Sequence, residues 1–555
     1  MNLANLGLSG LTAASNRLQT AGHNINNAAT DGFNRQTVLV QTAGATSTGA
    51  GYIGRGVQAV TVQRAYDGFL AKQLVAAQTQ GAALVSYGNE ISQINNLFAD
   101  RTVGITPALQ KFFDGVQAVA SAPADSAARQ ELIGRASSLV AQVNDANAFL
   151  DSQRGNINTQ ITTTVTQINS YVERVRDLNT QITVARATSS KHEPNDLLDQ
   201  RDQLVSELSQ LVSVRVLEQD GNFNLTVGNG QVLLGGNTVF PLAAQPSADD
   251  PSRTIVAYTA IGSSGTPITI EMDEAAFKGG SLGGLITYRR ESLDAVQNDL
   301  GRLATGLGMA VNEIHRKGAD LSNANGGNFF TVGASKVLPS ATNSATGSLG
   351  ATIEDINQLT SLDYRVERSA GGYTITSVPN GASKTFLDAD LTAAGDKASV
   401  DGVEFDFGSV ATPAIGDSWL VQPTRSAAGN LALAITDPAK IAAAAPNTGT
   451  ANGDIGLELA QLQTKKVLGN NAMSLNESFS QIVNKIAVQT QQNGTAAKAQ
   501  ATLIQQNFSA QQAVSGVNLD EEYVNLTRFQ EQYSAAARLI EVSSTLFNTL
   551  IGIRG

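Results

Sequence analysis

The sequence predicts an α+β multidomain protein in which long terminal helices form a coiled-coil-like rod and β-rich domains are inserted into the helical core. Three observations support this fold class. Both ends of the chain carry an apolar stripe that repeats every seven residues, which is the pattern of a coiled coil or helix bundle. Two internal regions change to a period of two, which is typical of strands, and helical patterns resume after each of them.

The first helix is expected from residue 1 to about residue 30, where Asp31-Gly32 forms a turn. Its apolar stripe has a regular 4-3 spacing. The stripe consists of Ala4, Leu8, Leu11, Ser15, Leu18, Gly22 and Ile25. Extended chain with frequent glycines follows to about Val62.

Long helical patterns cover residues 63–211, and helix returns over residues 281–330 and 446–510. The clearest stripe has 4-3 spacing and one central polar member. It consists of Ile157, Ile161, Thr164, Ile168, Tyr171, Val175, Leu178 and Ile182. Because no single helix can bury its own stripe, the three segments are expected to pack together as one helical rod domain.

The two regions with a period of two are predicted to be insertions into this rod. Residues 212–280 form the smaller one, in which Phe223, Leu225 and Val227 alternate with polar residues. Residues 331–445 form a second, β-rich outer domain with Trp419 in its core. The expected architecture is therefore nested, with both termini at one end.

The last helix is expected to join the first, so that residues 1–62 and 511–555 form a terminal assembly domain. Asn518 and Glu521 occupy the N-cap and capping-box positions at its start. Its stripe consists of Leu526, Phe529, Tyr533, Ala536, Ile540, Ser543, Phe547 and Leu550. Helices that depend on partners to cover a stripe are marginal alone. The two stripes are thus predicted to be the seam through which copies assemble, with both ends frayed in a free monomer.

Composition excludes several classes of function. The net charge is −11 with no basic block, which argues against a nucleic-acid partner. The absence of cysteine excludes disulfides and thiolate metal sites. No stretch approaches the roughly 18 apolar residues of a transmembrane helix, so no membrane insertion is expected. The first five residues lack the features of a cleaved secretory signal.

No pattern in the sequence indicates a catalytic, cofactor-binding or metal site. His23, His192 and His315 lack metal-ligand spacing. Gly228-Asn229-Gly230 lacks the strand-to-helix frame of a phosphate loop, and Asp388-Ala389-Asp390 lacks the remainder of a calcium loop. We therefore expect that the protein is not an enzyme and needs no cofactor.

The end of the first helix carries the most specific motif. It reads Asn24-Ile25-Asn26-Asn27-Ala28-Ala29-Thr30-Asp31-Gly32-Phe33. This resembles the motif of the flagellar rod, hook and hook-associated axial proteins at Asn24, Asn27, Thr30, Gly32 and Phe33. Asn26 stands where that family usually has Ala. In physical terms the motif is a helix end whose Asn side chains bond backbone groups before a tight turn.

Three further segments resemble hook-associated members of that family more than the hook protein. They are residues 34–38, 195–202 and 515–522. The resemblance implies a structural subunit at the junction between hook and filament, with terminal helices that pack into tubes. It also implies self-association in a ring, contacts with the hook protein and with the next hook-associated junction protein, and binding to an export chaperone.

The same resemblance implies export by the flagellar type III apparatus. The protein would then lie in the cytoplasm before export and outside the cell, in the flagellum at the hook-filament junction, afterwards. Two alternatives stay open. One is a hook or distal rod protein of the same axial family. The other is a secreted coiled-coil adhesin or enzyme, which would need a site in the β insertions.

Overall fold

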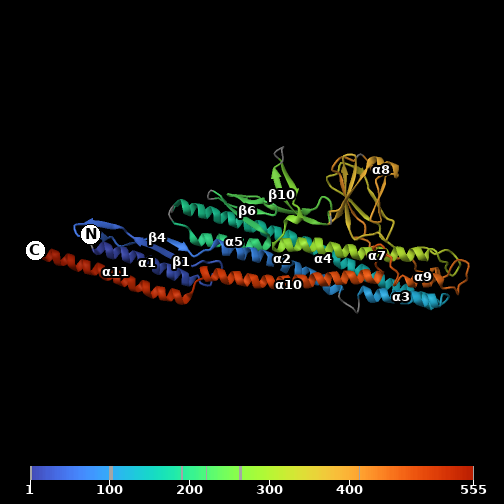
Figure 1. The fold of residues 1–555 in the computed structure, drawn as a ribbon, viewed down its shortest axis with the longest axis horizontal. Helices are drawn as coiled ribbons and strands as arrows, with labels where there is room; N and C mark the ends of the chain where they lie inside the picture. The colour runs from blue at the N-terminus through green and yellow to red at the C-terminus, as the bar shows by residue number, and fades with distance from the viewer. Residues whose placement is uncertain are drawn as a thin grey trace.

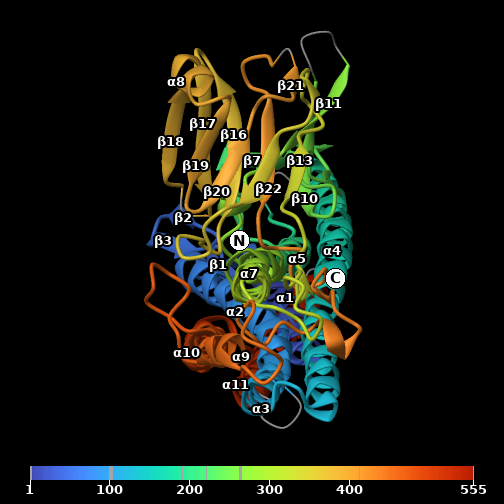
Figure 2. The ribbon, with the colours of Figure 1, turned by 90° about the vertical axis from the view of Figure 1, so that its right-hand side faces the viewer.

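The computed structural model describes residues 3–98, 104–188, 192–219, 222–261, 266–379, 381–411 and 413–553. It is a long helical rod from which two β-rich domains project on one side (Figures 1 and 2). Both chain ends lie toward the same tip, and α11 extends beyond the start of α1 (Figure 1). The predicted fold class, helical rod with inserted β domains, is confirmed.

The tip of the rod, which we call the arm, combines both ends of the chain. Its helices are paired along their length, and β1 pairs with β4 while β2 pairs with β3, both antiparallel. The arm consists of α1 (Leu3–Asn26), β1 (Gln36–Thr42), β2 (Ala45–Thr48), β3 (Gly51–Gly54), β4 (Val57–Arg64) and α11 (Leu519–Ile553).

The rod itself is built from helices far apart in sequence. α10 lies along α2, where Gln500 donates to the carbonyl of Ala77 at 2.9 Å and Asn493 to that of Leu84 at 3.0 Å. The rod helices are α2 (Gly68–Phe98), α3 (Ile105–Ser121), α4 (Ser126–Thr188), α5 (Asn195–Leu211), α6 (Gly280–Tyr288), a π-helical turn (Arg289–Leu293), α7 (Asp294–His315), α9 (Asp454–Gln461) and α10 (Leu475–Ser515). The predicted stripe on α4 is buried except for Tyr171, which is half-buried.

The small β domain lies against α4. Asn169 of α4 exchanges two hydrogen bonds with the backbone of Leu242, at 2.8 and 2.9 Å. Its sheets have the orders β5-β6-β7-β8 and β11-β10-β9. Its elements are β5 (Val214–Gln219), β6 (Asn222–Val227), β7 (Gln231–Gly235), β8 (Thr238–Val239), β9 (Leu242–Pro246), β10 (Thr254–Ile261), β11 (Pro267–Glu271) and a 3-10 turn (Glu274–Ala276).

The outer domain has its own apolar core between two main sheets, ordered β13-β22-β16-β17-β18 and β15-β20-β19. Trp419 is 1% exposed in that core, so its predicted placement is confirmed. The elements are β13 (Lys336–Pro339), β14 (Thr346–Gly347), β15 (Gly350–Ile353), β16 (Asp363–Ser369), β17 (Gly372–Val378), β18 (Ser383–Leu387), α8 (Asp388–Ala393), β19 (Lys397–Val400), β20 (Val403–Asp406), β21 (Val410–Ala411) and β22 (Ser418–Gln422).

Two element boundaries differ from those drawn on the sequence. The core of the outer domain runs from Leu349 to Val421, whereas Ala428 to Ala443 pack in the core of the rod. The reason is a short pairing of β12 (Phe330–Thr331) with β23 (Ala432–Leu433), which returns the chain to the rod before the 3-10 turn Pro438–Lys440. At the other end, α10 continues to Ser515, and the turn to α11 spans residues 516–518.

Candidate functional site

The arm is held together by a close approach of α1 and α11, which run antiparallel. Arg17 donates to Gln532 at 3.2 Å and lies over the ring of Phe529, 5.4 Å from its centroid. The face of α1 that meets α11 consists of small or polar residues. They are Gly7, Gly10, Ala14, Arg17, Ala21 and Asn24. A Cβ at Gly7 would lie 2.7 Å from Cγ1 of Ile540, so glycine is required for this approach.

The structure places most of the C-terminal stripe on the side of α11 that faces α1. Ala536 and Ser543 are buried there, and Leu526, Phe529 and Ile540 are half-buried. Tyr533, of the same stripe, is 39% exposed. Phe547 and Leu550 lie beyond the first described residue of α1 and are 60% and 66% exposed. The stripe thus continues past its intramolecular partner.

The N-terminal stripe lies on a different face of α1. Leu8 is 55% exposed, and Leu11, Leu18 and Ile25 are half-buried. These positions are each one residue after the small residues that meet α11, which turns them by about 100° around the helix. They therefore flank the α1–α11 contact and are not its centre. A third face of α1 meets the sheet, where Ser9 accepts from the backbone of Val57 at 3.4 Å.

α11 carries a second apolar stripe, which was not among the predicted seam residues. Leu539, Val542 and Leu546 directly precede residues of the first stripe, so the second stripe lies about 100° around the helix from it, and all of its members are exposed. They are Val524, Leu539, Val542, Leu546 and Ile553. Their spacing from Leu539 is 3-4-7, so the signal was present in the sequence. The neighbouring stripe, which contains aromatic residues, is stronger and obscured it.

The motif at the end of α1 builds the junction between arm and rod, which we call the joint. Asn24 is 1% exposed. Its side chain donates to the carbonyl of Gln36 at 2.9 Å and accepts from the amide of Gln36 at 3.0 Å. The side-chain nitrogen of Asn24 also lies 3.3 Å from a carboxylate oxygen of Glu522 on α11. A single side chain therefore closes the turn after α1 and connects it to the C-terminal helix.

The other motif residues shape that turn. Asn27 donates to the carbonyl of His23 at 3.0 Å, and the hydroxyl of Thr30 donates to Asn27 at 3.2 Å. Gly32 has φ of 78°, and a Cβ there would lie 2.8 Å from Cβ of Gln203. Glycine is required on both counts. The ring of Phe33 packs edge-on against His23, with centroids 5.4 Å apart.

Arg35 connects the turn to the first residues of α11. Its guanidinium lies 2.7 Å from Glu522 and 3.0 Å from Glu521, and its backbone amide donates to the carbonyl of Ser515 at 2.9 Å. Asn518 caps the helix by accepting from the amide of Asp520 at 3.0 Å. A groove of about 710 Å³ lies between α1, β1 and α11 beside these residues.

The rod side of the joint is supplied by α5. Asp199, 4% exposed, accepts from the backbone and side chain of Asn34 at 3.0 and 2.6 Å and from Arg64 at 2.7 Å. Burial raises the pKa of Asp199, although the hydrogen bonds from Arg64 and Asn34 oppose the rise. Asp196 accepts from Gln36 at 2.7 Å. The motif turn, segment 195–202 and segment 518–522 therefore meet at one place.

Comparisons with known proteins cover the whole chain. Family models match residues 91–330 (flagellar hook-associated protein FlgK helical domain), 338–423 (flagellar hook-associated protein 1, D2-like domain) and 504–553 (flagellar basal body rod FlgEFG protein C-terminal). Flagellar hook-associated protein 1 of Escherichia coli K12 is 38% identical over 555 residues, which is all of both chains.

The chain belongs to the flagellar hook-associated protein 1 family. A more distant relative, flagellar hook-associated protein 1 of Bacillus subtilis, is 24% identical and covers 98% of this chain and 96% of its own. The structure of the flagellar hook junction protein FlgK from Burkholderia pseudomallei matches with a TM-score of 0.74 and 29% identity, over 80% of this chain and all of that one. The predicted resemblance to hook-associated proteins is confirmed.

The buried histidine of α7, His315, is held by backbone groups of this hook-associated protein 1 fold. Its Nδ1 lies 2.8 Å from the carbonyl oxygen of Gly327, and its Nε2 accepts from the amide of Ala442 at 2.8 Å. Among the residues that the structure describes, no three or more His, Asp or Glu side chains gather as a metal site would require. Within the same described ranges no helix has the length and apolarity to span a membrane.

Proposed function

We propose that this chain is a structural, non-catalytic subunit that joins the flagellar hook to the filament and assembles through its arm. The observation that carries the proposal is the surface of α11. Large apolar side chains form two neighbouring stripes on that helix, and within the described part of the chain only one of them is covered, over part of its length. An extended exposed apolar surface marks an interaction site.

We infer that other copies of the chain cover this surface. Phe547 and Leu550 continue the stripe that α1 covers, so a second α1-like partner completes it. Leu8, Leu11 and Leu18 on α1 offer such a partner on the next copy. Repeated around an axis, this contact gives a ring with the arms inside and the β domains outside, because the β domains project from one side of the rod (Figure 2).

The remaining partners follow from family membership and belong to the same proposal. The ring contacts the hook protein on one side and the next hook-associated junction protein on the other. Before assembly the chain is cytoplasmic, binds an export chaperone and leaves through the flagellar type III apparatus, and afterwards it lies outside the cell. A hook or rod protein is less well supported, because the models that match residues 91–330 and 338–423 describe hook-associated proteins.

The test uses a strain that lacks the gene and carries variants of it. Phe547→Asp and Leu550→Asp place a charge on the uncovered end of the stripe, where α1 does not reach, so the pairing within the chain is unaffected. An unpaired charge in a dry interface is costly. We expect hooks without filaments, non-motile cells and flagellin in the medium.

Asn548→Asp is the matched control, since it adds the same charge to the same helix turn at an exposed polar position outside both stripes. Filaments should form with this variant. Truncation after Gly516, which removes α11, should reproduce the hook-only cell. Swimming cells with either stripe variant or with the truncation would disprove the assignment of the seam and of the junction role.

A further inference from the structure

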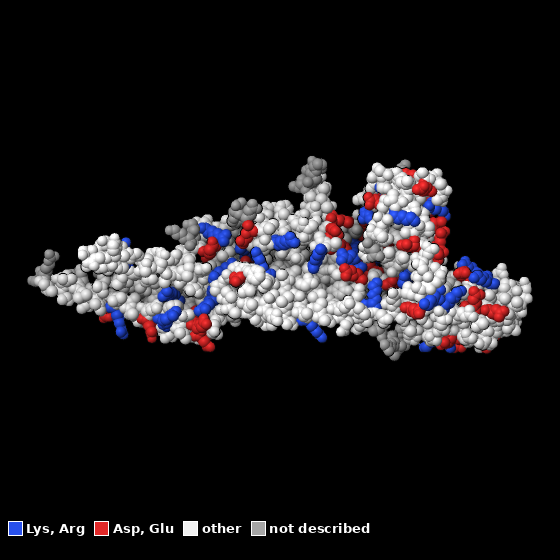
Figure 3. Space-filling view, viewed as in Figure 1, with Lys and Arg blue, Asp and Glu red and all other residues white. Residues whose placement is uncertain are grey.

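The outer domain and the rod have separate apolar cores. The core of the outer domain lies between its own sheets, and the rod core is continuous from α2 to α10. Ile356 of the outer domain packs half-buried against the rod core. Apolar packing at one point does not fix the angle between two bodies. Polar contacts also join the described parts of the two domains, and charged side chains gather where they meet (Figure 3).

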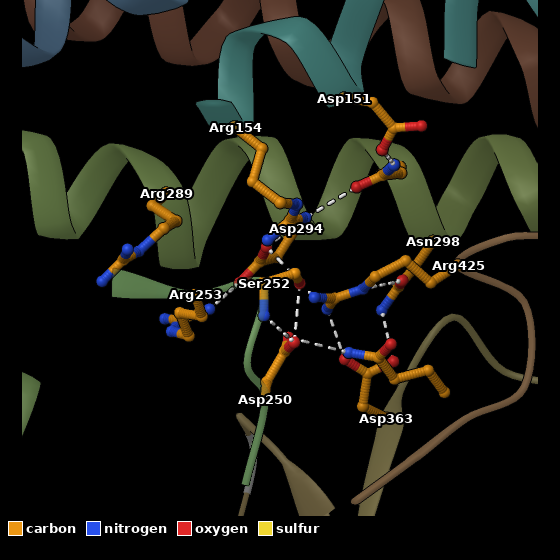
Figure 4. A network of polar contacts seen from close by, with 12 residues as sticks. Asp151, Arg154, Asp250, Ser252, Arg253, Arg289, Asp294, Asn298, Asp363 and Arg425 are labelled. Carbon is orange, nitrogen blue, oxygen red and sulfur yellow. Dashed lines mark hydrogen bonds and ion pairs between the residues drawn. The ribbon is translucent and has the colours of Figure 1, made fainter. Parts of the chain in front are cut away.

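At the centre of this contact lies Asp294, the first residue of α7, directly after the π-helical turn (Figure 4). Its carboxylate pairs with three guanidinium groups from three parts of the fold. Arg154 of α4 lies at 2.8 Å, Arg253 of the small β domain at 2.6 Å and Arg425, on the chain that leaves the outer domain, at 3.3 Å. Asp294 is 9% exposed.

Arg425 extends the contact into the outer domain. It donates to Asn298 of α7 at 3.0 Å and pairs with Asp363, the first residue of β16. Asn298 in turn donates to Asp363 at 3.1 Å. Arg425 and Asp363 are both more than nine-tenths buried. A buried charge must keep its partners, because its hydration is lost.

Arg253 extends the contact into the small β domain. It forms a two-bond pair with Glu274, at 2.5 and 3.1 Å, and Glu274 also pairs with Arg289 at 2.5 Å. Arg289, in the π-helical turn, is fully buried and donates to the carbonyl of Thr254 at 2.6 Å. Two-bond guanidinium–carboxylate pairs are directional as well as strong. The cluster therefore constrains orientation as well as proximity.

We propose that the Asp294 cluster (Asp294 with Arg154, Arg253, Arg425 and Asp363) is an orientation lock that holds the outer domain and the small β domain at one fixed angle to the rod. Each arginine connects a different part of the chain to one carboxylate. When one connection is removed, the domains stay folded, since each has its own core or packs on α4, but the outer domain swings about the two chain segments that join it to the rod.

The chain contains no cysteine, so two introduced cysteines carry spin labels at known sites. Ala389→Cys on α8 and Ala141→Cys on α4 are exposed positions in the outer domain and the rod. The distance distribution between the labels is measured in the full chain. The parent should give one narrow peak. Arg425→Met and Asp294→Asn should lose that peak and give a broad distribution.

Lys397→Met is the matched control, because its 2.6 Å pair with Glu404 lies wholly within the outer domain. It should keep the narrow peak. Circular dichroism checks that Arg425→Met is folded. If it is not, Asp363→Asn is used in the same distance measurement, because this isosteric change removes a charge at constant shape. The proposal would be overturned if folded Asp294→Asn kept the narrow, unshifted peak and either Arg425→Met or Asp363→Asn kept it as well.

Discussion

Arg35, in the turn after the first helix, forms a 2.7 Å ion pair with Glu522 in the first turn of the last helix, 487 residues later in the chain. The carboxylate of Glu522 is 3% exposed, whereas that of Glu521, which pairs with the same arginine, is 58% exposed. The two acids therefore allow a direct comparison of a buried and an exposed partner for one cation.

We expect Glu522→Ala to open the joint. It leaves Arg35 without its buried partner and removes an acceptor from buried Asn24, and leaving such groups unpaired typically costs about 1–3 kcal/mol. Glu521→Ala should cost at most about 1 kcal/mol, as exposed pairs do. Hydrogen exchange of the amides around residues 515–526 measures the difference. Equal protection in both variants would show that burial of Glu522 contributes nothing to the joint.

Asn24→Ala should loosen the turn after α1 more than Asn27→Ala does. Asn24 is buried and satisfies both backbone groups of Gln36, so its loss leaves buried polar groups unpaired at about 1–3 kcal/mol. Asn27 is half-buried, and the groups that it bonds remain accessible to water. The check is proteolysis between residues 24 and 36. Faster cleavage of Asn27→Ala than of Asn24→Ala would reverse the ranking.

Two glycines in α1 should respond in opposite directions. Gly7→Ala places a methyl group against Ile540 and should weaken the α1–α11 pair by about 1–3 kcal/mol, the usual cost of overpacking. A Cβ at Gly22 would meet no atom within 4 Å, so Gly22→Ala should stabilise the helix by up to about 1 kcal/mol. Thermal unfolding of the arm followed by circular dichroism compares them. Stabilisation by both would place Gly7 outside the contact.

Asp363 should make the outer domain less stable as the pH rises. Burial raises its pKa from 3.8 to about 6, with Asp294 contributing and Arg425 opposing. A carboxyl group with a raised folded-state pKa binds its proton more tightly in the folded chain. Its contribution to stability is therefore complete below pH 3.8 and is lost as the pH rises through 6.

The measurement compares the free energy of urea unfolding of the parent and of Asp363→Asn at each pH. Subtracting the two pH profiles cancels the titration of the groups that both chains share. Trp419 is the single tryptophan of the chain and lies in the outer-domain core, so its fluorescence reports that domain. Between pH 4 and 7 the parent should lose roughly 2 kcal/mol relative to the variant. Parallel pH profiles would show that Asp363 does not titrate in this range.

Periodicity predicted the helices and the nested order well, because a stripe such as Ile157 to Ile182 must be buried wherever the helix lies. The N-terminal stripe, which stays a prediction as a seam between copies, lies beside the α1–α11 contact and not at its centre. Large residues such as Leu8 and Leu18 defined the predicted seam, whereas close helix packing is decided by small ones such as Gly7. Contacts such as Arg35 with Glu522 join positions distant in sequence, and no local pattern carries that information.

α4 is a single helix of 63 residues, which at 1.5 Å per residue spans about 95 Å. A continuous helix of this length transmits force along its axis and resists bending, because its backbone hydrogen bonds are uninterrupted. A torque that reaches the arm therefore passes along α4 with little deformation. Compliance is concentrated where helices end, at the turn of residues 516–518 beside the joint. The stiffness of the connection between arm and rod is then set by the few polar side chains around Asp199 and Glu522.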